Sequence, residues 1–301
     1  MSRLVLVTLI WAFSFSLIDV YLAGQVDSDF AVLTRVVFAG VVFLPLMQFR
    51  GVRKELVAGM MITGGLQFGI TYFCLYRSFL FLSAPEVMLF TILTPVFVTL
   101  FDDLLNRRFS PVALAAALLA VTGAAVIRYD GITADYLTGF LLLQVANAAF
   151  AAGQIGYKNL LRWYPTDLPR YRFFGYFFAG ALIITLPGYL IFGDAARMPE
   201  TGLQWMVLLW LGLGASALGL YLWNQGATMV GAGTLAVMNN AVIPAGLLVN
   251  ILIWNREADL VRLSAGAAFL LLALWISRWS RNPAASRHAT GIGDGLEEEK
   301  Q

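Results

Sequence analysis

Cysteine and histidine are nearly absent from this chain of 301 residues, which contains one of each, Cys74 and His288. A single cysteine excludes an intrachain disulfide and a cysteine-based metal site. The single histidine lies in a polar C-terminal stretch, so catalysis by histidine and metal binding by a histidine cluster have almost no residues to use. We therefore expect no metal site.

Charged residues are also scarce. They make up 13% of the chain, whereas a soluble domain uses about 25%. Hydrophobic residues make up 59% and the mean hydropathy is +0.76, so the chain has too few polar residues to cover its apolar ones. The net charge of +2, without a cluster of Lys and Arg, also argues against a nucleic-acid partner. The solvent that suits this composition is lipid.

Long apolar stretches are what the chain has in abundance. A membrane-spanning helix needs about 20 mostly apolar residues, and ten stretches reach or approach that length: 4–22, 30–49, 56–80, 85–105, 112–128, 137–160, 171–192, 203–228, 233–254 and 263–279. A β-barrel would need short strands that alternate between apolar and polar residues. The sequence predicts an all-α membrane protein with ten transmembrane helices. Ser83 and Glu86, three residues apart, predict a capping box at the start of the fourth helix.

The basic residues predict the orientation of these helices. With the N-terminus in the cytoplasm, fourteen Lys and Arg residues lie on the inner side and four on the outer side. Cytoplasmic loops of membrane proteins are rich in Lys and Arg, so we expect both termini in the cytoplasm. Residues 282–301 are polar and are expected to form a disordered cytoplasmic tail.

The chain also repeats itself. A shift of 149 residues, without a gap, lays 65–107 onto 214–256. The identities in this register are Gly65 with Gly214, Tyr72 with Tyr221, Pro95 with Pro244, Asn106 with Asn255 and Arg107 with Arg256. Because five is an odd number, a second set of five helices enters the membrane upside down relative to the first. The sequence therefore predicts two inverted five-helix repeats, 1–130 and 131–281, which is typical of alternating-access transporters.

Several short motifs resemble a known family. They are Leu9-Ile10-Trp11, Thr34-Arg35, the block from Tyr72 through Ser83-Ala84 and Leu93-Thr94-Pro95 to Ser110, Ile243-Pro244, and Glu257. In these motifs the chain resembles the drug/metabolite transporter superfamily, of the ten-helix type with two EamA domains, over 4–279. Two positions depart from the family pattern. Arg108 replaces the usual acidic residue, and Asp19 stands where a neutral or basic residue is more common.

The resemblance implies an inner-membrane carrier, usually an exporter of small metabolites such as amino acids, other carboxylates or amines. Some relatives move nucleotide sugars or lipid-linked sugars, so the implied range of substrates is wide. The chain has no P-loop glycine pattern, so we do not expect ATP to drive transport. We expect no cofactor.

Four charged residues lie inside the expected helices, where a charge costs at least about 2.5–3.5 kcal/mol. They are Asp19, Arg35, Arg77 and Glu86, all near the outer helix ends. The set predicts a site for a zwitterion, in which Arg forks a carboxylate and an acidic residue holds an ammonium group. Two structural alternatives stay open: the balanced charges can pair among themselves and hold the helices together, and Glu86 can serve only to cap its helix.

The second half offers amides instead of charges. Asn147 and Gln154, two turns apart on one helix, and Asn240 are predicted to line the substrate cavity. Buried amides also join membrane helices to one another, which is the structural alternative. Trp11 and Tyr72 are candidate aromatic walls. Pro95 and Pro244 lie at equivalent positions of the repeat and are candidate hinges, because a proline inside a helix frees a carbonyl group.

Together these features favour a secondary transporter that exports a small metabolite (an amino acid, carboxylate or amine) across the inner membrane by alternating access. The alternative is a membrane-embedded enzyme or a partner of a lipid-headgroup flippase. An enzyme would need an acid–base or metal cluster, and the nearest feature is the pair Asp102 and Asp103. We expect no enzyme activity. The expected partners are a small-molecule substrate and the lipid bilayer, and a monomer and a homodimer are both left open.

Overall fold

The computed structural model of this protein describes residues 2–105, 133–230 and 232–254, together with the isolated helical positions 264, 268 and 272. Every element in these ranges is helical, which confirms the all-α prediction. The elements are α1 (Ser2–Tyr21), α2 (Ser28–Phe43), η1 (Leu44–Leu46), α3 (Lys54–Gly64), η2 (Gly65–Ile70), α4 (Thr71–Ser78), α5 (Ala84–Phe90), η3 (Thr91–Leu93), α6 (Thr94–Leu105), α8 (Ala134–Trp163), α9 (Tyr171–Phe192), α10 (Gly202–Trp210), η4 (Leu211–Leu218), α11 (Gly219–Thr228) and α12 (Ala232–Trp254).

Seven helical segments of the described ranges are long and apolar enough to cross a membrane. They are Ser2–Tyr21, Ser28–Leu46, Lys54–Ser78, Ala84–Leu105, Ala134–Trp163, Tyr171–Phe192 and Gly202–Thr228. A shorter apolar stretch, Met238–Ile253, lies within α12. Each corresponds to one expected segment. The expected segments 112–128 and 263–279, and the tail 282–301, lie outside the described residues.

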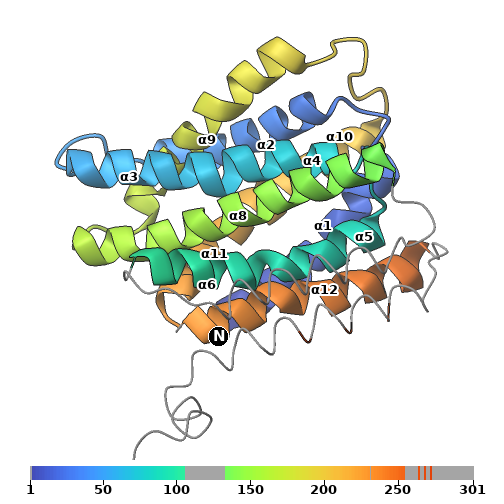
Figure 1. Ribbon diagram of the computed structural model, residues 1–301. Helices are drawn as coiled ribbons and strands as arrows, with labels where there is room; N and C mark the ends of the chain where they lie inside the picture. The colour runs from blue at the N-terminus through green and yellow to red at the C-terminus, as the bar shows by residue number, and fades with distance from the viewer. Residues whose placement is uncertain are drawn as a thin grey trace, which may run out of the picture.

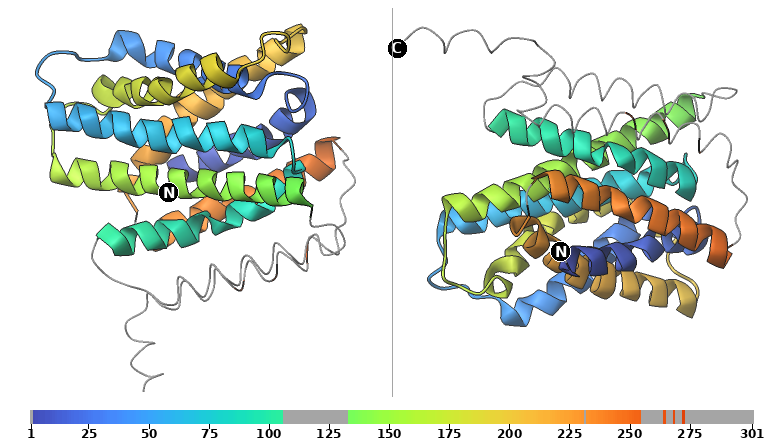
Figure 2. Two further views of the ribbon diagram at one scale, coloured as in Figure 1. Left: turned by 45° about the horizontal axis from the view of Figure 1, so that its top comes forward. Right: turned by 90° about the horizontal axis from the view of Figure 1, so that it is seen from below.

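The helices lie side by side in one bundle (Figures 1 and 2). Short connections join α1 to α2 and α4 to α5, so these ends meet on one side of the bundle. We call this side the Tyr21 end and the opposite side the Ser2 end. In Figure 1 the Tyr21 end is on the right, where α8 also begins. The prediction from the basic residues places the Tyr21 end outside the cell.

Glycines allow α3 and α9 to approach closely. A Cβ atom added at Gly64 would overlap the backbone of Phe177, and one added at Gly180 would overlap the backbone of Met61. Lipid tails are as apolar as the helices, so close backbone packing of this kind is a main source of attraction between membrane helices.

Two of the spans contain a π-helical segment, η2 in one and η4 in the other. π-helical turns are rare in proteins as a whole, and those that occur are often found at functional sites. The 149-residue shift of the predicted repeat lays η2 onto 214–219, which overlaps η4. The repeat stays a prediction, and the same irregularity at corresponding places supports it.

The start of α5 confirms the predicted capping box. The backbone N–H and the hydroxyl of Ser83 both donate to Oε2 of Glu86, each at 2.8 Å.

The two prolines that the sequence predicts as hinges have different surroundings. The 3₁₀ turn η3 ends two residues before Pro95, which lies in the first turn of α6. Proline lacks the N–H that would bond to the carbonyl of Thr91, and the hydroxyl of Thr94 donates to this carbonyl at 2.8 Å. Pro244, in contrast, lies within the continuous helix α12. The hinge roles of both prolines stay predictions.

Replacing Gly180 by alanine is expected to destabilise the protein, because the new Cβ would overlap the backbone of Met61. Overpacking of this kind costs about 1–3 kcal/mol. Gly202→Ala is the matched control, since a Cβ at Gly202 meets no atom within 4 Å. The midpoint of thermal unfolding in detergent is the measurement. Equal midpoints for the two variants would contradict the close approach of α3 and α9.

Candidate functional site

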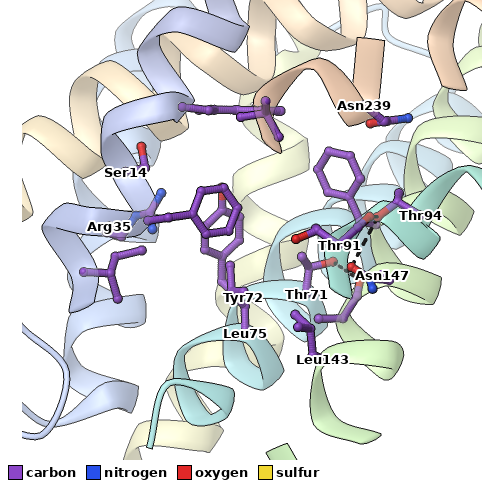
Figure 3. A pocket seen from close by; sticks show the side chains of 16 residues that line it. Ser14, Arg35, Thr71, Tyr72, Leu75, Thr91, Thr94, Leu143, Asn147 and Asn239 are labelled. Atoms are coloured by element: carbon purple, nitrogen blue, oxygen red, sulfur yellow. Dashed lines mark hydrogen bonds between the residues drawn. The ribbon is translucent and has the colours of Figure 1, made fainter. Parts of the chain in front are cut away.

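A pocket opens between helices that come from both halves of the chain (Figure 3). Its lining residues are Trp11, Ser14, Phe15 and Ile18 of α1, Arg35 of α2, Thr71, Tyr72 and Leu75 of α4, Thr91 of η3, Thr94 of α6, Leu143, Ala146, Asn147 and Phe150 of α8, and Asn239 and Val242 of α12. Ile18 and Leu75 lie within one turn of the Tyr21 end. The pocket therefore extends from near that end toward the middle of the bundle.

Arg35 is the charged residue of the pocket lining, and its side chain is fully buried. Nε and Nη2 donate to the hydroxyl of Ser216 at 3.1 and 2.9 Å, and Nη1 donates to the hydroxyl of Tyr76 at 2.9 Å. The guanidinium carbon lies 4.2 Å from the ring centroid of Tyr72. Within the described residues no carboxylate forms an ion pair with Arg35.

This arrangement leaves Arg35 able to bind an anion. An arginine side chain has five N–H donors, and the three bonds above use three of them. A buried charge is expensive unless it is paired, and the partners here are neutral hydroxyls and an aromatic ring. A carboxylate in the pocket would supply the missing opposite charge and accept two N–H groups at once.

The opposite side of the pocket carries neutral polar groups, as Figure 3 shows. The hydroxyl of Thr94 donates to Oδ1 of Asn147 at 3.2 Å, and Nδ2 of Asn147 donates to the carbonyl of Phe90 at 3.0 Å. Nδ2 of Asn239 is buried and has no partner among the described residues. Asn239 thus offers a donor, whereas the polar groups of Asn147 are already bonded.

Aromatic rings form much of the remaining wall. Nε1 of Trp11 donates to the carbonyl of Ala215 at 2.9 Å, which fixes the indole. Its ring centroid lies 6.0 Å from that of Phe150 and 4.9 Å from that of Trp223. The pocket is therefore lined by flat apolar surfaces, with a cation on one side and an amide on the other.

The structure brings together four of the nine residues that the sequence predicted for the site. These are Trp11, Arg35, Tyr72 and Asn147. The other five do not line this pocket: Asp19, Arg77, Glu86, Gln154 and Asn240. Their predicted contact with a substrate stays a prediction.

Arg77 forms an ion pair that the sequence analysis did not identify. Its Nη2 lies 2.7 Å from Oδ2 of Asp29, a buried residue in the first turn of α2. The guanidinium also packs against two rings, 4.0 Å from the centroid of Phe73 and 4.7 Å from that of Phe192. These contacts join α2, α4 and α9. They match the alternative in which charges hold helices together, with Asp29 as the partner.

Glu86, Gln154 and Asn240 each have a different environment. Glu86 caps α5 and Gln154 accepts a hydrogen bond from Nε1 of Trp223 at 3.0 Å. Both side-chain polar atoms of Asn240 are buried without a partner among the described residues, but its neighbour Asn239 is the one in the pocket lining. Asp19 lies half-buried in the last turn of α1.

Several lining residues were missed because their side chains are small and common. Ser14, Thr71, Thr91 and Thr94 carry hydroxyls that bond to backbone carbonyls of their own helix or turn. Ser and Thr hydroxyls are common in the packing of membrane helices, so nothing in the sequence marked these four residues as part of a site. Within the described ranges, no three His, Cys, Asp or Glu side chains gather as metal ligands do.

Comparison with known proteins identifies a family. The model of the EamA-like transporter family matches residues 2–129. A protein of Pseudomonas aeruginosa named "Probable biotin transporter" is 63% identical over 281 residues, which are 93% of this chain and 98% of the relative. The "Biotin transporter" of Escherichia coli K12 is 43% identical over 290 residues, which are 96% of each chain.

A solved crystal structure supports the fold independently. It superposes with a TM-score of 0.64, at 17% sequence identity, over 95% of this chain and 97% of the other. Identity this low shows similarity of fold alone. Because nearly the whole length of both chains is covered, the likeness includes the arrangement of the helices that form the pocket.

The ion pair between Arg77 and Asp29 is expected to stabilise the protein. A double-mutant cycle with Arg77→Leu and Asp29→Leu should give a coupling energy of about 1–3 kcal/mol, because residues in one partly buried network are coupled to this extent. Thermal unfolding of the four proteins in detergent measures the coupling.

The control is the exposed pair of Arg53 and Glu55, whose closest atoms are 3.8 Å apart. Its coupling energy should be below about 1 kcal/mol, since solvent screens exposed charges. A coupling energy for Arg77 and Asp29 as small as that of the control pair would contradict the expectation that this ion pair stabilises the protein.

Proposed function

The chain belongs to the EamA-like transporter family, and from that premise we propose that it carries biotin across the bacterial inner membrane. It is a multi-pass membrane protein and a secondary transporter of a small metabolite, not an enzyme. The choice of biotin is supported by the names of its relatives and by the chemistry of the pocket.

The observation that carries the proposal is the buried Arg35, which has no carboxylate partner among the described residues. Biotin has three parts: a carboxylate on a short alkyl chain, a sulfur-containing ring, and a fused ring that contains a urea group. The negative carboxylate of biotin would pair with the positive guanidinium of Arg35. Of the substrate classes expected from the sequence, the carboxylates fit this site best.

The rest of the pocket suits the rings of biotin. Trp11, Phe15 and Phe150 provide apolar walls for the fused rings and the alkyl chain. The carbonyl of the urea group needs a hydrogen-bond donor, and Nδ2 of Asn239 is a buried donor without a partner among the described residues. Figure 3 shows Arg35 and Asn239 on opposite sides of the pocket, as the two ends of an elongated molecule require.

We propose uptake as the direction, with the export implied by the family resemblance as the competing proposal. Alternating access is reversible, so net flux follows the gradients. At the Ser2 end, Arg3 donates to Oε1 of Gln225 at 2.5 Å and Arg170 donates to the hydroxyl of Thr228 at 2.7 Å. These contacts hold α1, α9 and α11 together on that side. If the Ser2 end lies in the cytoplasm, as the basic residues predict, these contacts join the helices on the cytoplasmic side while the pocket extends toward the outer end, which supports loading from outside.

Arg35→Gln is expected to lower the affinity for biotin about 10- to 100-fold. A hydrogen bond to a charged group contributes about 1.5–3 kcal/mol, and each 1.4 kcal/mol is tenfold in affinity. Uptake of radiolabelled biotin by bacteria without other biotin transport measures the effect. Competition by biotinamide, which lacks the negative charge, separates charge recognition from folding. Biotinamide should compete weakly against biotin in the wild type and about as well as biotin in the variant.

Two controls complete this experiment. Arg53→Gln removes an exposed cation outside the pocket and should leave uptake unchanged. Cells preloaded with biotin test export. Efflux without uptake would reverse the proposed direction, and wild-type protein that moves biotin in neither direction would refute the proposed substrate.

A further inference from the structure

A second group of polar side chains lies buried beyond the pocket, toward the Ser2 end. Gln67 of η2, Gln154 of α8 and Asn224 of α11 are each fully buried. Both polar side-chain atoms of Gln67 and of Asn224, and Nε2 of Gln154, have no hydrogen-bond partner among the described residues. A buried polar group without a hydrogen-bond partner destabilises the folded state. Three such side chains in one region call for an explanation.

Contacts bring together the helices that carry these amides. Oε1 of Gln154 accepts from Nε1 of Trp223 at 3.0 Å, and Asn224 is the next residue of α11. A Cβ added at Gly153 would overlap the Cβ and the backbone of Gln67, so η2 lies directly against α8 beside Gln154. We call Gln67, Gln154 and Asn224 the amide cluster.

One face of α8 connects the pocket to the amide cluster. Leu143, Asn147 and Phe150 line the pocket. The same spacing of three and four residues continues through Gln154 to Tyr157, and residues so spaced share one face of a helix. From Asn147 to Gln154 the distance along the axis is about 10 Å. The cluster is therefore the next polar position along the face that lines the pocket.

Three aromatic rings separate the two positions. Trp11, Phe150 and Trp223 contact one another with centroid distances of 6.0 Å for Trp11 and Phe150, 4.9 Å for Trp11 and Trp223, and 6.5 Å for Phe150 and Trp223. Trp11 and Phe150 line the pocket, while the hydrogen bond of Trp223 is to the amide cluster. We call these rings the aromatic gate.

We propose that the amide cluster is a second substrate position, which binds the neutral urea group of the substrate after the aromatic gate opens. The inference rests on the proposed function and adds to it a step between the pocket and the Ser2 end. Amide side chains present both donors and acceptors, which is the pattern that a urea group requires. The cluster contains no charge, so it does not take the carboxylate, and that group stays with Arg35.

The first test measures access to Gln154 with a thiol reagent that does not cross membranes. In a Cys74→Ala background, Gln154→Cys introduces the single cysteine of the chain. It is expected to react when the reagent is applied at the Tyr21 end, because the reagent enters the pocket there and reaches position 154 when the aromatic gate opens. Ala151→Cys, on the same helix but buried against Val98 and Ile155, is the matched control and should not react.

Opening the gate should increase this reaction. Trp223→Ala removes the ring contacts with Trp11 and Phe150 that hold the gate closed, so Gln154→Cys should react about tenfold faster in that variant. Gln154→Cys that reacts no faster than Ala151→Cys, with and without Trp223→Ala, would overturn the proposal. This test needs no substrate, so it remains decisive even where wild-type protein fails to transport biotin.

The second test separates binding from transport. Asn224→Leu and Gln67→Met replace amides without partners by apolar side chains of similar size, so thermal stability should be unchanged or higher. Binding of biotin to purified protein should be retained, because the pocket is intact, while the rate of transport should fall about tenfold or more. Lower stability together with an unchanged transport rate would make the amides structural and overturn the proposal.

Discussion

In the interior of a bilayer there is no water to bond with an exposed N–H or C=O group, and each unsatisfied group costs several kcal/mol. The spans of this protein follow that constraint, because helices satisfy their backbone internally. Where the regular pattern is interrupted, another group takes over, as the hydroxyl of Thr94 does for the carbonyl that Pro95 leaves free. Glu86 does the same for the N–H at the start of α5. Against this background the buried amides that have no partner among the described residues call for an explanation.

Some polar groups in and beside the pocket lie at or next to interruptions of the helices. Thr91 lies in the 3₁₀ turn η3, and Thr71 follows directly after the π-helical segment η2. Ser216, which accepts two bonds from Arg35, lies inside the second π-helical segment, η4. A π-helical segment widens a helix and a 3₁₀ turn tightens it, and both move side chains away from the positions that they would take in a regular helix. The irregular segments therefore supply part of the polar surroundings of Arg35 and of the pocket.

The fold was predictable because a membrane span is assigned from the average hydropathy of about 20 residues, so an error of one residue in a boundary does not change the number or order of the helices. The site depends on single residues and on helix rotation. Arg35 was predictable, since a cation inside a span has few ordinary reasons to be there. Asp29 was not, because an acidic residue in the first turn of a helix is usually an exposed one, and only tertiary packing places it against Arg77. Asn239 and Asn240 differ by one residue, about 100° around α12, and the sequence alone contains no information on that rotation.

Arg35 also has an electrical consequence. Among the described residues its charge has no counter-ion, so the pocket is positive when unloaded and neutral when it holds a carboxylate. Moving one elementary charge through the whole membrane potential corresponds to about 2.3 kcal/mol per 100 mV, so the potential acts on the unloaded protein in proportion to the part of the field through which Arg35 moves. Inside-negative voltage assists the return of the unloaded site after export and opposes it after uptake. An uptake cycle that moves no net charge must therefore bring in one cation with each carboxylate.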